Sequence, residues 1–321
     1  MVAVYNRTLE RAKETAGKFS IPRYYDDIEA LFADEELDFV DIITDVDTHP
    51  KFVEMAAARG LAVICQKPMA PDLAQARHML ETCQRAGVPF FIHENFRWQA
   101  PIRKLKEILN SGAIGQLFKA RVTFACSFPV FQNQPFLAEL EQFILTDIGS
   151  HILDICRFLF GEAQSLYCLT QSVNPGIKGE DVANVLMQMD SGVQCYAEMS
   201  YASILEHEQF PQTYVLVEGE SGSVSLGKNF EIRITTKEGT QVETGAPTLY
   251  DWVDPDYAVV HASIVDCNRD LLNALQGKAE AETTGADNYK TVQLVFGCYE
   301  SAENNRAVKP TPEKTSYTNQ T

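Results

Sequence analysis

The 321-residue chain lacks long apolar stretches and paired cysteines. No apolar run approaches the roughly 18 residues of a membrane-spanning helix. The opening residues, MVAVYNRTLERA, place no basic segment ahead of an apolar one, as a secretory signal would. The eight cysteines include no C-x-x-C pair, so the usual zinc and thioredoxin spacings are absent. Because most of them lie in apolar segments, we expect free thiols and a reducing, cytoplasmic location.

Basic residues are also scarce, with 27 Lys and Arg against 44 Asp and Glu and a formal net charge of −17. Affinity for nucleic acid comes largely from Lys and Arg on phosphate, so this balance argues against a nucleic-acid partner. It argues equally against an anionic membrane surface. The acidity favours solubility and leaves a small neutral substrate open.

A third absence is the strand, G-x-G-x-x-G turn and helix with which a dinucleotide-binding unit begins. The nearest approximation, GESGSVSLG (219–227), has no helix pattern after it and is typical of a hairpin. The chain opens on MVAVYN, which resembles the second strand of such a unit. We therefore expect a Rossmann-type domain that is incomplete at its N-terminus, with the first strand and loop preceding Met1.

Strands and helices alternate through the first third of the chain. Apolar strands are predicted at 38–44, 61–67 and 89–94, and a helix over 72–87 that ends at Gly87. This alternation is typical of parallel βαβ units covered by helices on both faces. We expect an α/β fold whose Rossmann-like parallel sheet domain spans residues 1–115.

The pattern changes after residue 115. Consecutive strand patterns follow one another, with hairpin turns predicted at 190–192 and 220–222 and helices at about 147–160 and 285–303. Residues 116–321 are therefore predicted to form an α+β domain with a large, mainly antiparallel sheet, suited to substrate binding and oligomerisation.

Lys67 stands at the end of the predicted strand LAVICQK, after Gln66 and before Pro68. In a parallel sheet the carboxyl ends of the strands face the ligand crevice. Proline fixes one backbone angle, so the direction of the turn is defined. We expect Lys67 to point into a cleft between the two domains.

Asp147 and His151 are four residues apart in TDIGSHILDICRFLFG and so share a helix face. One interpretation is a solvated polar face, with Asp147, Ser150, His151, Asp154 and Arg157 on it. The other is a histidine oriented by a carboxylate, an arrangement that suits a general base near neutral pH.

Two further segments carry polar groups at the expected crevice. Asn6 and Arg7 end the first strand, where an acidic residue would accept from the ribose 2′-hydroxyl of NAD, so NADP is permitted. HENFRWQAP (93–101) crowds His93, Glu94, Asn95, Arg97 and Trp98 onto the crevice side of the sheet and suits either a ligand wall or an interdomain hinge. The histidines, cysteines and carboxylates form no coherent ligand set, and no metal is predicted.

Taken together, these residues resemble the Gfo/Idh/MocA family of oxidoreductases. CQKPMA looks like the family's C-E-K-P-x-A segment, DIGSHILDICRFLFGE its D-x-G-x-H-x-x-D helix, and ITDVDTHPKF its T-P-N-x-x-H loop. SGAIGQL and TTGADNYKTVQLVFGCYESA resemble its entry to the second domain and its closing helix. The departures are the absent glycine-rich loop, Gln66 in place of Glu, and Asp45-Val46 in place of Pro-Asn.

The resemblance implies an enzyme, an NAD- or NADP-dependent dehydrogenase or reductase acting on a hydroxyl or keto group of a sugar or polyol. It implies that His151 takes the hydroxyl proton, Asp147 holds the His151 tautomer and Lys67 contacts the reacting oxygen. The expected substrate contacts are Lys67, Asp147, His151 and Trp98. The expected cofactor-binding residues are Asn6, Arg7, Thr44, His49, Gln66, Lys67, Asn95 and Arg97.

The resemblance also implies a homodimer or homotetramer formed through the sheet of the second domain. Because the phosphate loop is absent, the alternative is a non-catalytic, ligand-sensing or partner-binding protein on the same fold.

Overall fold

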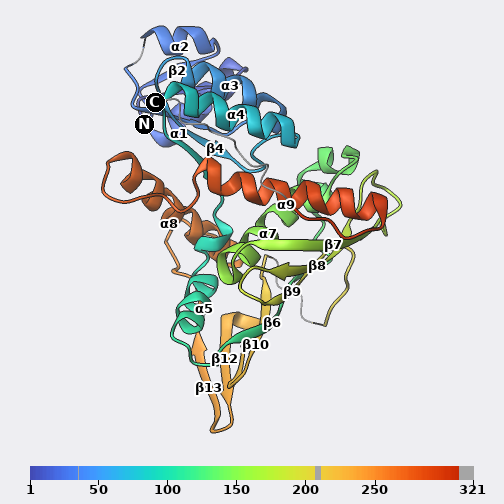
Figure 1. The fold of residues 1–321 in the computed structure, drawn as a ribbon. Helices are drawn as coiled ribbons and strands as arrows, with labels where there is room; N and C mark the ends of the chain where they lie inside the picture. Colours follow the sequence, from blue (N-terminus) through green and yellow to red (C-terminus); the bar gives the residue numbers. More distant parts are fainter. Residues whose placement is uncertain (35, 207–210, 311–321) are drawn as a thin grey trace, which may run out of the picture.

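The computed structural model describes residues 1–34, 36–206 and 211–310, and its first half carries two parallel sheets (Figure 1). One pairs β1 (Ala3–Tyr5) with β2 (Arg23–Tyr25). The other has the order β3 (Phe39–Ile42), β4 (Ala62–Gln66), β5 (Phe90–His93). The predicted parallel, Rossmann-like half is confirmed. β2, three residues long, was not expected from the sequence.

The helices of this half are α1 (Leu9–Phe19), α2 (Ile28–Asp34), α3 (His49–Ala57) and α4 (Leu73–Ala86). Local signals define α4 at both ends. The Asp72 carboxylate accepts the Gln75 backbone N–H at 2.8 Å, and Gly87 adopts a positive φ of 69° just after the last turn. Val53, Val63 and Met79 are among the residues that bury the contact of α3 and α4 with the sheet.

The second half contains an eight-stranded sheet in the order β13-β12-β11-β10-β6-β9-β8-β7. β6 and β9 run parallel, and the other neighbouring pairs are antiparallel. The predicted hairpins are confirmed, and GESGSVSLG belongs to the β10–β11 hairpin. The strands are β6 (Leu117–Ala125), β7 (Ala163–Gln171), β8 (Val182–Met189), β9 (Gln194–Ser200), β10 (Tyr214–Gly219), β11 (Gly222–Leu226), β12 (Glu231–Thr236) and β13 (Gly239–Thr244).

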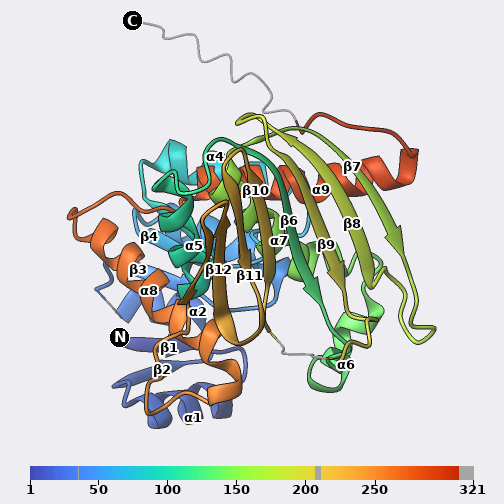
Figure 2. The same ribbon diagram turned by 90° about the horizontal axis from the view of Figure 1, so that it is seen from below.

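Helices cover one face of this sheet (Figure 2). α7 (Ile144–Phe160) packs on β6, β8 and β9 and against α9 (Gly285–Asn304), which itself lies on β7, and α5 (Ala100–Asn110) packs on β11. A short helix, α6 (Val130–Asn133), follows β6. Because α7 is enclosed on two sides, almost all of its residues are buried.

The last part of the chain returns to the first half. α8 (Ala258–Leu275), a helix the sequence analysis did not anticipate, packs Cys267 and Leu271 against Ile64 and Phe91 of the parallel sheet. Three-residue η2 (Phe96–Trp98) lies beside it. The domain partition at residue 115 stays a prediction. Within the described ranges, no helix is both long and apolar enough to cross a membrane.

Candidate active site

Lys67 follows the last residue of β4 and reaches the first turn of α7. Its Nζ donates to Asp147 Oδ1 at 3.0 Å and to the Asp147 backbone oxygen at 3.2 Å. The Lys67–Pro68 peptide bond is cis, and 22% of the lysine side chain is exposed. The lysine therefore points from the end of a parallel strand toward the second half of the chain, the direction expected from its place in the sheet.

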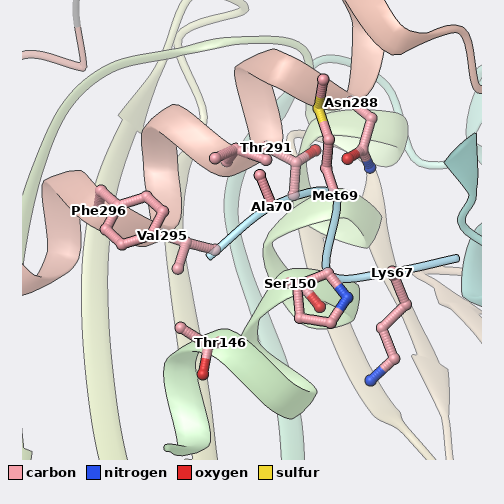
Figure 3. Close-up of a pocket in the computed structure, with 11 residues that line it drawn as sticks. Lys67, Met69, Ala70, Thr146, Ser150, Asn288, Thr291, Val295 and Phe296 are labelled. Carbon is pink, nitrogen blue, oxygen red and sulfur yellow. The ribbon is translucent and has the colours of Figure 1, made fainter. Parts of the chain in front are cut away.

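The turn after Lys67 passes between α7 and α9, and the lysine's amino group points away from Val295 and Phe296 (Figure 3). A cavity of about 20 Å³ lies beneath this turn, lined by Met69 and Val295 among others. A space of that size holds about one water molecule.

His151 lies one turn after Asp147 on α7, but its partner is Glu94. The two atoms His151 Nδ1 and Glu94 Oε1 are 2.6 Å apart, and both side chains are buried. The Phe96 ring stacks on the imidazole with centroids 3.7 Å apart and an interplanar angle of 7°. The sequence paired this histidine with Asp147, whereas in the structure the carboxylate beside its ring is that of Glu94.

The carboxylate oxygens of Asp147 bond with Lys67 and Tyr201 and not with the His151 ring. Asp147 Oδ1 accepts from Lys67, and its Oδ2 accepts from the Tyr201 hydroxyl at 3.2 Å. Tyr201, just after β9, was not recognised from the sequence. The site thus contains two carboxylates with separate partners, Asp147 with Lys67 and Glu94 with His151.

Both carboxyl groups are ionised at neutral pH. Burial acts to raise the pKa of Glu94, but His151, the Phe96 amide and Lys67 outweigh it and hold that pKa below 4.5. Burial likewise opposes the shift at Asp147, where Lys67, His151 and Tyr201 hold the pKa below 3.8. Burial, together with the charge of Asp147, raises the pKa of Tyr201 well above 10, so its hydroxyl stays a donor.

The polar face of α7 is buried, so its interpretation as a solvated face is wrong. Asp154 has no exposed surface, and Arg97 forks onto it with bonds of 2.7 and 2.6 Å. Arg97 also donates to Asp287 Oδ2 at 2.7 Å and to the Glu282 backbone oxygen. This guanidinium is occupied by protein acceptors, and the contact of Arg97 with a cofactor stays a prediction.

Asn95 and Trp98 fasten η2 to its neighbours. Asn95 Nδ2 donates to Ser263 Oγ at 2.7 Å, and Trp98 packs against the cluster formed by α8 and the parallel sheet. The guanidinium of Arg103 covers the Trp98 ring at 4.3 Å from its centroid. These contacts favour a hinge-like wall between the two halves over direct contact of Asn95 with a cofactor or of Trp98 with a substrate.

The remaining predicted cofactor residues line the carboxyl ends of β1, β3 and β4. Asn6 Oδ1 accepts from the Thr8 amide, and exposed Arg7 approaches Asp45 at 3.6 Å. Thr44 accepts from the Thr48 hydroxyl at 2.7 Å. Gln66, the last residue of β4, is half-buried beside Lys67.

His49 is buried, with only 1% of its surface exposed, and its two ring nitrogens face protein carbonyl groups. Nε2 lies 3.1 Å from the Thr44 oxygen and Nδ1 lies 3.1 Å from the Pro68 oxygen. The ring therefore ties the end of β3 to the turn after Lys67. It supports this turn, and the contact of His49 with a cofactor stays a prediction.

The sequence placed Glu94 on the crevice side without a role, and the register of the parallel strands explains why it lies near Lys67. β4 and β5 pair Gln66 with His93, so Lys67 and Glu94 follow their strands at the same edge. Carboxyl ends of neighbouring parallel strands converge on one crevice. The sequence signal for Glu94 was thus the same one that identified Lys67.

Two family models match this chain, and both describe oxidoreductases of one family. "Oxidoreductase family, NAD-binding Rossmann fold" matches residues 1–94, and "GFO/IDH/MocA C-terminal domain" matches residues 102–225. Over 308 residues the chain is 42% identical to a D-apiose dehydrogenase of Rhizobium rhizogenes, covering 96% of this chain and 89% of that protein. It is 44% identical over 309 residues to a D-apiose dehydrogenase of Paraburkholderia graminis, covering 96% and 82%.

Solved structures give the same result. An oxidoreductase from Agrobacterium radiobacter, in complex with NAD+, L-tartaric acid and magnesium, superposes with a TM-score of 0.94 at 42% identity, covering 96% of this chain and 90% of that chain. A levoglucosan dehydrogenase, in complex with NADH and levoglucosan, has a TM-score of 0.83 at 18% identity and shares the fold. These relatives favour a hydride-transferring enzyme over the ligand-sensing alternative.

Proposed function

The chain belongs to the Gfo/Idh/MocA family of NAD-binding oxidoreductases, and on that premise we propose that it transfers a hydride between a nicotinamide cofactor and a hydroxyl or keto group of a sugar. The observation that carries the proposal is the meeting of Lys67 and His151. One follows a parallel strand, the other lies on α7, and each has its own buried carboxylate partner. Both stand at the edge of the sheet where α/β proteins bind ligands.

In this proposal His151 is the general base for sugar oxidation. Its Nδ1 faces Glu94, so Nε2 is the nitrogen left to accept the hydroxyl proton. The Lys67 ammonium donates a hydrogen bond to the reacting oxygen and stabilises its alkoxide character. Asp147 accepts from the amino group of Lys67 and holds it in place, and the Tyr201 hydroxyl donates to the other oxygen of the Asp147 carboxylate. When bound, the nicotinamide accepts the hydride.

The crevice edge suits the ribose and nicotinamide parts of such a cofactor. Arg7 is 74% exposed and has only a 3.6 Å contact to Asp45, and Ile43 leaves an apolar side chain 67% exposed at the end of β3. Asn6, Arg7, Thr44, Gln66 and Lys67 would hold the cofactor. The 321 residues include no G-x-G-x-x-G segment to cradle its pyrophosphate.

For the sugar we propose D-apiose, because two relatives above 40% identity over 96% of this chain carry that activity in their names. The proposal is tested by following reduced nicotinamide in the presence of D-apiose, D-xylose, myo-inositol or levoglucosan, with NAD+ or NADP+. D-apiose should give the highest kcat/KM. Turnover of another sugar at higher kcat/KM would transfer the assignment to that sugar.

The catalytic assignment of Lys67, Asp147 and His151 is tested with Lys67→Ala and His151→Ala. Each should lower kcat by roughly 10²- to 10⁴-fold, the usual contribution of a positioned acid, base or oxyanion partner. Lys104→Ala, which removes a lysine paired with Glu243 on the hairpin side of the molecule, is the matched control. Unchanged turnover in both site variants would overturn the assignment.

We further propose a homodimer or homotetramer formed through the outer face of the eight-stranded sheet, and a cytoplasmic location. The sheet pairs place Tyr167, Leu186, Tyr196, Arg121 and Leu216 in one row across five strands of that face. Leu186 is 41% exposed and Leu216 is 39% exposed. All eight cysteines are free, buried thiols, which supports a reducing compartment.

A further inference from the structure

Glu94 is enclosed by protein, yet it keeps its charge. The residue has no exposed surface, and its Oε1 accepts from the Phe96 amide at 3.1 Å and faces His151 Nδ1 at 2.6 Å. Within the described part of the chain its Oε2 has no hydrogen-bond partner. An ionised carboxylate this deeply buried is stable only beside a compensating donor or cation. The His151 ring and Lys67 supply that compensation.

The backbone around Glu94 is fixed on both sides. The residue follows β5, and the next side chain, Asn95, is tied to Ser263 of α8 at 2.7 Å. The Glu94 backbone oxygen also lies against the thiol of Cys267 on α8. The Glu94 carboxylate therefore approaches His151 from the end of β5 in the parallel sheet, whereas His151 lies on α7 in the second half of the chain.

Charge in the site is balanced only when His151 is protonated. Lys67 and Asp147 cancel each other, which leaves the negative charge of Glu94 beside the imidazole. The other charged or titratable groups nearby are His93 on β5 and the Arg97–Asp154 pair. A proton taken from a substrate hydroxyl thus moves to a ring whose positive charge Glu94 already opposes.

We propose that Glu94 is the positioning residue that holds His151 in the Nδ1–H tautomer and stabilises its protonated form during catalysis. The inference rests on the proposed hydride transfer. As the substrate O–H bond breaks, the proton forms a bond with His151 Nε2. The carbon that bears this oxygen gives its hydride to the nicotinamide, and the C–O bond becomes a C=O group. Glu94 takes no proton and remains a carboxylate throughout.

The kinetic test is Glu94→Gln, which keeps the shape of the side chain and removes its charge. We expect kcat to fall by roughly 10²- to 10⁴-fold with KM changed by only a few fold, as for loss of a tautomer-setting carboxylate. Because the negative charge no longer favours imidazolium, the acidic limb of the kcat/KM profile should move to lower pH. Glu94→Asp, which keeps the charge, should recover part of kcat, and the acidic limb of its kcat/KM profile should stay at the wild-type pH.

A matched control removes a second Glu–His pair from the surface. Glu54 Oε1 lies 2.6 Å from His78 Nε2, and both side chains are half-exposed on α3 and α4. Glu54→Gln should leave kcat and the pH profile unchanged. If Glu94→Gln lowers kcat without moving the acidic limb, Glu94 is a structural residue only and the proposal is overturned.

The second test does not require turnover, so it separates this inference from the proposed function. Nitrogen NMR of ¹⁵N-histidine protein, with the His151 signals assigned from their absence in His151→Asn, reports which ring nitrogen carries the proton. We expect Nδ1–H in the wild type and in Glu94→Asp, and loss of that preference in Glu94→Gln. An Nε2–H tautomer in the wild type overturns the proposal, whether or not Glu94→Gln folds.

Discussion

Among single residues, Arg7 is the one placed to influence the choice of dinucleotide. It follows Asn6 at the end of β1, where an acidic residue would bind a ribose 2′-hydroxyl and repel a 2′-phosphate. We expect Arg7→Ala to weaken NADP(H) binding by about 10- to 100-fold, because a charge-assisted hydrogen bond contributes roughly 1.5–3 kcal/mol. NAD(H) binding should change less than about twofold.

The measurement is titration of the protein with each reduced cofactor, followed by fluorescence. Arg85→Ala removes an arginine of α4 that pairs with Glu81 and serves as the control. If Arg7→Ala weakens both cofactors equally, the guanidinium contacts a part that the two share.

Individual residues also show how far the sequence could lead. The position of Lys67 was predictable because one strand and one proline define it. The partner of His151 was not, because Asp147 is four residues away in the chain and Glu94 is 57 residues away. Spacing along a helix places Asp147 near His151 but does not reveal the lysine that competes for its carboxylate.

At the scale of elements, Glu162 couples α7 to α9. Just beyond the end of α7, it accepts from Arg157 at 2.8 and 2.9 Å and from Lys290 of α9 at 3.0 Å. Burial acts to raise its pKa, but Arg157 and Lys290 prevail and lower it from 4.5 to about 2. A depressed carboxyl pKa stabilises the fold above the unfolded value, so this contribution is complete above 4.5 and is lost as pH falls toward about 2.

Glu162→Gln should therefore be less stable than the wild type by up to about 1 kcal/mol at neutral pH, a modest effect because the carboxylate is 44% exposed. The difference should narrow steadily below pH 4.5. Urea unfolding across that range measures it, and Lys290→Met should give a smaller difference with the same trend. A gap that stays constant into acid would show that the charge of Glu162 is not responsible.

Elements with local signals were predicted, and elements defined by distant packing were not. α4 was recognisable from its apolar spacing and from Gly87. α8 begins at Ala258, its N-cap residue Tyr257 makes no side-chain capping bond, and its buried residues face a sheet formed some 200 positions earlier in the chain. The three-residue β2 is held by pairing with β1, which no pattern of so few residues can reveal.

For the whole molecule, the outer face of the eight-stranded sheet determines the assembly we propose. Leu186→Arg together with Leu216→Arg places two positive charges in the row that already holds Arg121, so the new charges have no opposite charge within that row. A buried interface does not tolerate unpaired charges, so we expect the assembly to dissociate into monomers. Light scattering after size exclusion gives the mass, and Leu272→Arg, at an exposed position of α8, is the control. An unchanged mass in the double variant would show that the subunit interface does not include this face of the sheet.

Helix α9 belongs to two cores at once. Val292 packs in the core of the parallel sheet, Leu294 and Cys298 pack in the core of the eight-stranded sheet, and Phe296 touches both. Unfolding of either core would remove the packing from one side of α9 and would expose apolar surface of the remaining core. The two halves are therefore expected to melt as one cooperative unit, and relative motion between them is limited to what a shared helix can absorb.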